Sequence, residues 1–220
     1  MKIAVVGAHG KIGRLLVPIL RERGDDVLGI VRAEGQPALV ESLGGKAVLL
    51  DVEHSTTEQI AEALKGADAV VWSAGAGGGD PARTYAVDRD AASRTMDAAA
   101  SAGVSRFVMV SWIGSVPDHG VEEGAGFYPY ADAKLAADDH LRGTDLDWTI
   151  LGPGTLTDDD PTGAIRLLGD DDSVEQGPGS QVPRADVAMV VAQALHSSAS
   201  VGRFVRFTSG ETPILEAFSE

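Results

Sequence analysis

A regular alternation of short apolar runs and amphipathic segments extends along almost the whole chain and constrains the fold more than any other feature. The first run, from Ile3 to Val6, is β-branched and ends at a glycine, which is typical of a strand buried on both faces. The next segment, from Ile12 to Leu20, repeats apolar residues at helical spacing. Because strands that alternate with helices form βαβ units, the sequence predicts an α/β fold with a doubly wound parallel sheet and helices on both faces.

The predicted elements follow one another without an interdomain linker, so we expect residues 1–220 to form a single domain. Further strands are expected at 26–31, 46–50, 69–72, 106–111, 146–151 and 203–207, and further helices at 37–43, 57–64, 81–102, 129–142 and 187–195. Thr212 and Pro213 predict the N-cap and first position of a short terminal helix. Two stretches, about 112–127 and 152–182, are predicted to be irregular and to lie on the substrate side, the second as a small lid, because both follow strand ends.

Composition excludes several classes of function. The chain has 33 acidic and 18 basic residues and a net charge of −15, which argues against binding to nucleic acid or to an anionic membrane. It has no cysteine, and its five histidines are scattered, so we expect no disulfide and no metal site. No apolar stretch reaches the roughly 20 residues that span a bilayer. We therefore expect a cytoplasmic protein, a monomer or small homo-oligomer, with a small-molecule substrate.

A glycine motif lies between the first predicted strand and the first predicted helix. Gly7 permits a tight turn, Gly10 lets the backbone approach a diphosphate, and Gly13 lets the helix pack closely on the strand. The free N–H groups and the positive dipole end of the helix then face the phosphates. This context predicts a dinucleotide cofactor on a Rossmann-like fold, with three further loop residues beside it: His9, Lys11 and Ile12.

The ends of the next strands favour NADP(H) over NAD(H). An acidic residue at the end of the second strand would bind the ribose 2′-hydroxyl, whereas an arginine accommodates a 2′-phosphate. The strand ends at Arg32, and the next acidic residue is Glu34. After the third strand, Asp51 and Val52 suit the adenine. After the fourth strand, small residues let the backbone pass close to the cofactor: Ser73, Ala74 and Gly75.

Tyr130 and Lys134 are the predicted chemical groups. At i and i+4 on a helix, the phenol and the ammonium share one face, and an adjacent cation lowers the pKa of a phenol toward neutrality. Such a pair can protonate a carbonyl oxygen as a hydride arrives from a nicotinamide. The same spacing is also found in ordinary surface pairs, but its position on the helix after the fifth strand favours a catalytic role.

Together these residues resemble the short-chain dehydrogenase/reductase superfamily, most closely its atypical branch of NmrA-like and biliverdin-reductase-B-like NAD(P)-binding proteins. Further matches lie in 87–108, 147–154, 184–188 and 209–213. The resemblance implies an NADP(H)-dependent reductase in which Ser111 or Ser115 orients the substrate carbonyl and Lys134 also reaches the nicotinamide ribose. It also implies that Pro153 and Gly154 lie beside the cofactor.

Three positions depart from the superfamily's pattern. Trp112 stands where a second serine is common, Asp88 lies near the position of a relay asparagine, and Gly152 replaces an arginine. Aromatic residues around the first irregular stretch are candidates for the wall of an apolar pocket: Trp112, Phe127 and Tyr128. The sequence thus predicts a reductase of a small carbonyl, quinone or flavin-like compound. A non-enzymatic NADP sensor is the alternative, and an epimerase or isomerase with tightly held NADP is a third hypothesis.

Overall fold

A computed structural model describes residues 1–169, 172 and 180–218. Its main sheet contains nine strands: β1 (Lys2–Val6), β2 (Asp26–Val31), β3 (Lys46–Leu49), β4 (Ala69–Trp72), β5 (Arg106–Val110), β6 (Asp147–Pro153), β8 (Ala164–Leu168), β10 (Arg203–Ser209) and β11 (Thr212–Pro213). Their order in space is β11-β8-β10-β6-β5-β4-β1-β2-β3. All pairings from β10 to β3 are parallel, whereas β8 pairs antiparallel with both of its neighbours. The predicted Rossmann-like sheet is confirmed.

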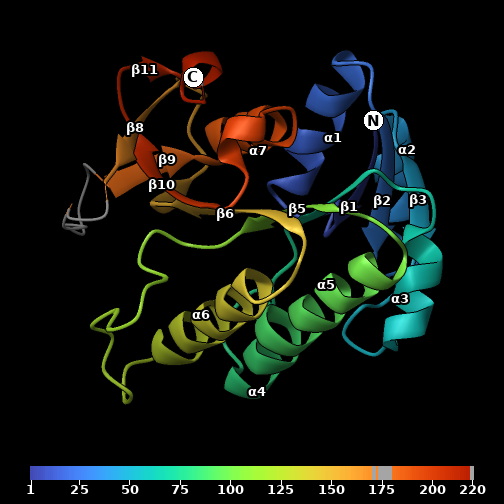
Figure 1. The fold of residues 1–220 in the computed structure, drawn as a ribbon, viewed down its shortest axis with the longest axis horizontal. Helices are drawn as coiled ribbons and strands as arrows, with labels where there is room; N and C mark the ends of the chain where they lie inside the picture. Colours follow the sequence, from blue (N-terminus) through green and yellow to red (C-terminus); the bar gives the residue numbers. More distant parts are fainter. Residues whose placement is uncertain (170–171, 173–179, 219–220) are drawn as a thin grey trace.

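Helices cover both faces of this sheet (Figure 1). One face carries α1 (Gly13–Glu22), α2 (Pro37–Ser42) and α7 (Arg184–Leu195), and the other carries α3 (Thr57–Leu64), α5 (Ala92–Ser101) and α6 (Tyr128–Arg142). Smaller elements are α4 (Pro81–Thr84), two 3₁₀ turns (Ser198–Ser200 and Ile214–Glu216), and a parallel pair of β7 (Thr155–Thr157) with β9 (Gln181–Pro183). Among the residues described, no helix is both long and apolar enough to cross a membrane.

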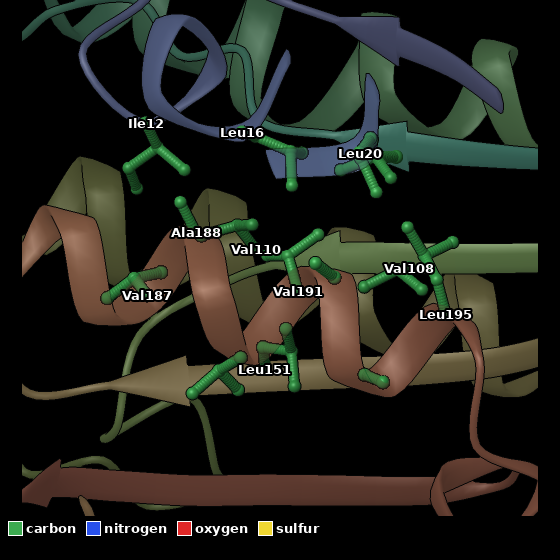
Figure 2. Close-up of a cluster of buried hydrophobic side chains, with 14 of the residues drawn as sticks. Ile12, Leu16, Leu20, Val108, Val110, Leu151, Val187, Ala188, Val191 and Leu195 are labelled. Carbon is green, nitrogen blue, oxygen red and sulfur yellow. The ribbon is translucent and has the colours of Figure 1, made fainter. Parts of the chain in front are cut away.

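The apolar stripes predicted for residues 12–20 and 187–195 lie on α1 and α7, which pack against each other on one face of the sheet. Leu16 and Leu20 of α1 point toward α7, whose Val187 and Val191 belong to the same buried cluster (Figure 2). All four side chains are fully buried. Burial of each such side chain stabilises the fold by about 1.5–3 kcal/mol, so this layer fixes α1, and the loop before it, against the sheet.

Three expected elements differ from the structure. The helix expected at 81–102 consists of α4, a π-helical segment (Tyr85–Ala91) and α5. The stretch expected to be irregular at 152–182 contains β7, β8 and β9, because β8 extends the sheet by pairing with β10. Thr212 and Pro213 form β11 against β8 instead of a helix start. Residues 170–171 and 173–179 of the expected lid lie outside the described residues.

The strand order reverses between β1 and β4, which lead to opposite sides of the sheet. In open α/β sheets the carboxyl ends of the strands at such a point form the ligand-binding crevice. The glycine loop, the end of β2 and the segment after β4 all lie at this edge. The fold therefore gathers the residues predicted to bind a cofactor.

Candidate cofactor and substrate site

The glycine loop has no space for side chains at two of its three glycines. Gly7 has a φ of +86°, and a Cβ there would lie 2.7 Å from the backbone of Ala74 after β4. A Cβ on Gly13 would lie 2.4 Å from the carbonyl oxygen of Gly7. These contacts confirm the predicted tight turn and close packing of α1. At the start of α1, Ile12 makes no side-chain cap, and the N–H groups of Arg14 and Leu15 donate to the carbonyl oxygens of Gly10 and Ile12 at 2.9 and 3.0 Å. The positive end of the helix dipole lies at this loop and favours an anion there.

A cleft of about 220 Å³ opens above this loop. Its walls come from the glycine loop and from the ends of β2, β3 and β4. Nine of the predicted cofactor residues line it: Gly7, His9, Gly10, Arg32, Asp51, Val52, Ser73, Ala74 and Gly75. Gly10 lines this space, and a Cβ there would lie 3.0 Å from the Gly7 carbonyl oxygen. The cradle fits a dinucleotide, because it presents bare backbone where a diphosphate must approach closely.

At the mouth of this cleft, Arg32 is exposed, and its guanidinium has no partner within the described chain. Gln36, which sequence reasoning missed, fixes the backbone here. Its Oε1 accepts hydrogen bonds from the N–H groups of Arg32 (3.1 Å) and Ala33 (3.2 Å). The turn is thus rigid while the cation remains free to contact a phosphate.

The two carboxylates on the cleft wall are already engaged. Asp51 accepts a hydrogen bond from the backbone N–H of Glu53 at 3.1 Å and contacts the His54 ring at 2.9 Å. This contact raises the pKa of the exposed His54 imidazole. Glu53, also missed from the sequence, pairs with Arg83 at 3.3 Å. Neither carboxylate is left to oppose a phosphate near Arg32.

A second, larger cleft of about 930 Å³ lies above the ends of β5 and β6. Four predicted residues line it: Ser111, Tyr130, Pro153 and Gly154. Its wall is aromatic, with the rings of Trp112 and Phe127 edge to face at 5.2 Å and those of Phe127 and Tyr130 also 5.2 Å apart. Tyr128 does not line this cleft and packs on His119 at 5.8 Å. The cleft suits a flat, apolar ligand.

Tyr130 faces this cleft as a neutral phenol. Burial raises the pKa of Tyr130, and the nearby carboxylates of Asp88 and Asp138 raise it further. The expected lowering by Lys134 is therefore wrong for this geometry. The Lys134 ammonium instead donates to the carbonyl oxygen of Val110 at 2.9 Å and to the sulfur of Met109 at 3.3 Å. A neutral phenol can donate a hydrogen bond across the working pH range, but it gives up its proton reluctantly.

The two candidate serines converge on one buried carboxylate. Ser111 and Ser115 donate to the same oxygen, Oδ2 of Asp138, at 2.5 and 2.6 Å. Burial raises the pKa of Asp138, whereas the charge of Lys134 and the two serine hydroxyls act in the opposite direction. Ser111 lines the second cleft; Ser115 is fully buried and does not. Of the two, Ser111 is therefore placed to meet a substrate.

The π-helical segment positions a second buried acid beside Lys134. Asp88 lies in this segment and accepts a hydrogen bond from the N–H of Ala76 at 3.1 Å. Burial raises the pKa of Asp88, although the Lys134 charge opposes the shift. Single π-helical turns are frequent at functional sites, because the extra residue redirects a side chain. One ammonium thus has two buried carboxylates as electrostatic neighbours.

Four of the predicted site residues line neither cleft: Lys11, Ile12, Gly13 and Lys134. Lys11 forms an exposed ion pair with Asp158 at 2.6 Å. Asp138 was not singled out from the sequence as a site residue, although its spacing from Tyr130 and Lys134 indicates a shared helix face. It lies at i+4 from Lys134 and i+8 from Tyr130, and therefore on the same face of α6. The roles of all these residues stay predictions.

Comparison with known protein families shows the family of this chain and the class of cofactor that the family binds. The family model described as NAD(P)H-binding matches residues 7–198. The chain belongs to this NAD(P)H-binding family. The match confirms the resemblance to the atypical short-chain dehydrogenases/reductases, and it establishes a nicotinamide cofactor without deciding between NAD and NADP.

Proteins similar to this chain carry differing functional names. The chain is 37% identical over 223 residues to the "uncharacterized sugar epimerase YhfK" of Bacillus subtilis, with 100% of both chains covered. A structure from Bacillus halodurans, provisionally assigned as an NAD-dependent epimerase/dehydratase, has a TM-score of 0.90 at 30% identity and covers 99% and 98% of the two chains. The oxidoreductase ylbE from Lactococcus lactis has a TM-score of 0.85 at 32% identity, covering 99% and 95%.

Proposed function

We propose that this member of the NAD(P)H-binding family is an NADP(H)-dependent reductase of a small, flat, apolar carbonyl, quinone or flavin-like compound. The observation that carries the proposal is the pair of clefts at one sheet edge. One is lined by the glycine loop and the free Arg32, and the other by aromatic rings, Tyr130 and Ser111. A dinucleotide laid along this edge brings its reactive end toward the second cleft.

In this function the first cleft holds the cofactor and the second cleft holds the substrate. The N-terminus of α1 and the bare backbone at Gly10 hold the diphosphate, and Arg32 binds the 2′-phosphate. A bound reduced nicotinamide supplies the hydride. The Tyr130 phenol donates a hydrogen bond to the substrate oxygen and so stabilises the negative charge that develops there. The aromatic wall of the second cleft orients a flat substrate and excludes water.

The first test combines cofactor titration with turnover. Calorimetry with NADPH and NADH measures binding, and nicotinamide absorbance measures oxidation by benzaldehyde, menadione or FMN. Tyr130→Phe is expected to keep NADPH affinity and to lower turnover of benzaldehyde by about 10²–10³-fold, as for loss of an oxyanion donor. Tyr128→Phe, on the same helix but outside the cleft, is the matched control. Tight NADPH binding without oxidation by any probe would favour the NADP sensor.

An epimerase is the second candidate, because the names of YhfK and of the Bacillus halodurans structure point to that chemistry. The second cleft argues against a nucleotide-sugar substrate. Its described lining contains no lysine or arginine to meet a substrate diphosphate. An epimerase that holds its NADP tightly would show no net oxidation of NADPH, whereas the proposed reductase consumes one NADPH for each substrate reduced.

A further inference from the structure

The cluster behind Ser111 has more buried carboxylates than buried cations. Asp138 and Asp88 are 0% and 2% exposed, and Lys134, 1% exposed, is a buried ammonium whose charge acts on both. Arg142 also acts on Asp138 through its charge, but it is partly exposed and pairs with Asp139 at 2.6 Å. An unbalanced charge is expensive to bury. The cluster becomes neutral if one of the two carboxylates holds a proton.

The hydrogen bonds identify Asp138 as a suitable proton carrier. Its Oδ2 contacts both serine hydroxyls, whereas its buried Oδ1 has no hydrogen-bond partner within the described chain. An ionised carboxylate with one bare buried oxygen is poorly satisfied. When Asp138 is ionised, both serine protons point at it and Ser111 has no proton to donate to the cleft. When Asp138 is protonated at Oδ2, it donates to Ser111, and the Ser111 hydroxyl turns its own proton outward.

We propose that Asp138 carries the proton that the reduction consumes and passes it to the substrate through the hydroxyl of Ser111. This inference rests on the proposed reductase function and deepens it. The substrate carbon gains the hydride and its oxygen gains the Ser111 proton. Ser111 regains a proton from Asp138, which is left ionised. After product release, water in the cleft returns a proton by the same path. Asp138 is thus a positioning and proton-supplying residue that acts through Ser111.

This route moves proton delivery away from Tyr130, which the sequence predicts as the proton donor. Tyr130 polarises the substrate oxygen, and the Ser111–Asp138 pair delivers the proton. Ser115 donates to the same carboxylate but does not line the cleft, so it holds Asp138 in place without contacting the substrate. The groups that face Asp138 and influence its charge are Lys134, Arg142, Tyr130 and the two serines.

The kinetic test uses benzaldehyde and NADPH with the full chain. Asp138→Asn keeps a hydrogen-bonding side chain of equal size and removes the acid. It is expected to lower kcat by about 10²-fold or more, the scale of general acid catalysis, and Ser111→Ala should do the same. Because the two residues act as one unit, the double variant should be no slower than either single variant. Tyr128→Phe, which lies outside the cleft, should stay within a few-fold of the wild type.

The pH profile distinguishes proton supply from a structural role. The wild-type kcat should fall as pH rises through the raised pKa of Asp138, and this limb should be absent in Asp138→Asn. Thermal melts check that the variants fold, and NADPH titration checks that they bind the cofactor. Wild-type turnover with an unchanged pH limb in Asp138→Asn would overturn the relay. Additive losses in the double variant would also overturn it.

A readout without cofactor keeps the relay separate from the reductase proposal. Infrared spectroscopy of the protein alone should show the carbonyl stretch of a protonated carboxylic acid at neutral pH, and this band should disappear in Asp138→Asn. Absence of the band in an active wild type would overturn the relay but leave the reductase intact. Presence of the band with no turnover of any probe would overturn the reductase and reduce Asp138 to a buried structural acid.

Discussion

Among the residues described at the mouth of the cofactor cleft, the two acidic side chains are paired and the arginine is not. Asp51 contacts His54, and Glu53 pairs with Arg83, while the guanidinium of Arg32 stays unpartnered in the part of the chain that the structure describes. Charge-assisted hydrogen bonds from arginine to phosphate are short and often bidentate. Arg32 is therefore the residue whose removal should change the choice between the two nicotinamide cofactors.

Arg32→Asp is expected to weaken NADPH binding by about 1.5–3 kcal/mol, or roughly 10- to 150-fold, the range for hydrogen bonds to charged groups. NADH binding should weaken less or improve, since the new carboxylate can accept from a ribose 2′-hydroxyl. Calorimetric titration of both cofactors measures the ratio. Arg203→Asp controls for the change in net charge, because Arg203 is exposed and begins β10, whereas the cofactor cleft lies at the carboxyl ends of the strands. Equal affinity of the wild type for both cofactors would contradict the assignment of Arg32.

Single residues were predictable where their role follows from local position. Gly7, Arg32 and Asp51 each follow a strand that the apolar pattern shows, and all three line the first cleft. The pKa of Tyr130 was not predictable in the same way. Its direction depends on Asp88 and Asp138, and burial, the largest cause, is a property of the packed fold. Spacing along a helix shows which side chains share a face, but it does not show which of them bond elsewhere.

At the scale of elements, the glycine loop meets two requirements, helix packing and cofactor binding, and a different glycine serves each. Gly13 serves packing, since a Cβ there would lie 2.4 Å from the Gly7 carbonyl oxygen and 2.7 Å from the Ala8 Cα. Gly10 serves binding, since the contacts of its Cβ would be a carbonyl oxygen at 3.0 Å and another at 3.9 Å, with the cleft beyond. Stability and cofactor affinity should therefore respond to different glycines.

Gly13→Ala is expected to destabilise the protein by about 1–3 kcal/mol, because the backbone of Gly7 and Ala8 must shift to admit the methyl group. Gly10→Val should keep the protein folded, lower the melting temperature less than Gly13→Ala does, and remove NADPH binding, because its methyl groups occupy the phosphate path. Calorimetric melting and NADPH titration of both variants measure the two effects, and each variant is the control for the other. Normal NADPH affinity in Gly10→Val would show that the loop does not hold the diphosphate.

At the scale of the whole molecule, β8 and β11 extend the sheet beyond the parallel strands, and the apolar pattern of the sequence did not predict them. Only Ile165 of β8 is fully buried, so the segment shows no continuous apolar run. Its partner β11 has two residues, too few for any periodic signal. The central parallel strands β1, β4 and β5 were predictable because both of their faces are covered, which demands apolar residues along most of each strand. β8 is exposed or only half-buried at its other four positions, so it needs no such run.

Asp25 joins the amino terminus to the distant end of α7, and its titration should therefore affect the stability of the whole fold. It is 2% exposed, contacts the Met1 ammonium at 2.9 Å and lies 2.8 Å from the His196 ring. Burial alone would raise the pKa of Asp25, but hydrogen bonds from the amino terminus and from His196 outweigh burial and lower it. A carboxyl group with a lowered native pKa contributes stability above its unfolded pKa, and this contribution is lost as pH falls through the native value.

Asp25→Asn should thus reduce the free energy of unfolding by about 1–3 kcal/mol at neutral pH. The difference from the wild type should shrink as pH falls below the ordinary carboxyl range, because the wild-type group is then protonated as well. Guanidinium titration at a series of pH values, on protein without an amino-terminal tag, measures this difference. Asp26→Asn is the control: Asp26 is 77% exposed and pairs with the exposed Arg21, so its loss should change stability by about 0.5 kcal/mol or less. A pH-independent difference for Asp25→Asn would mean that its charge does not connect the two ends of the fold.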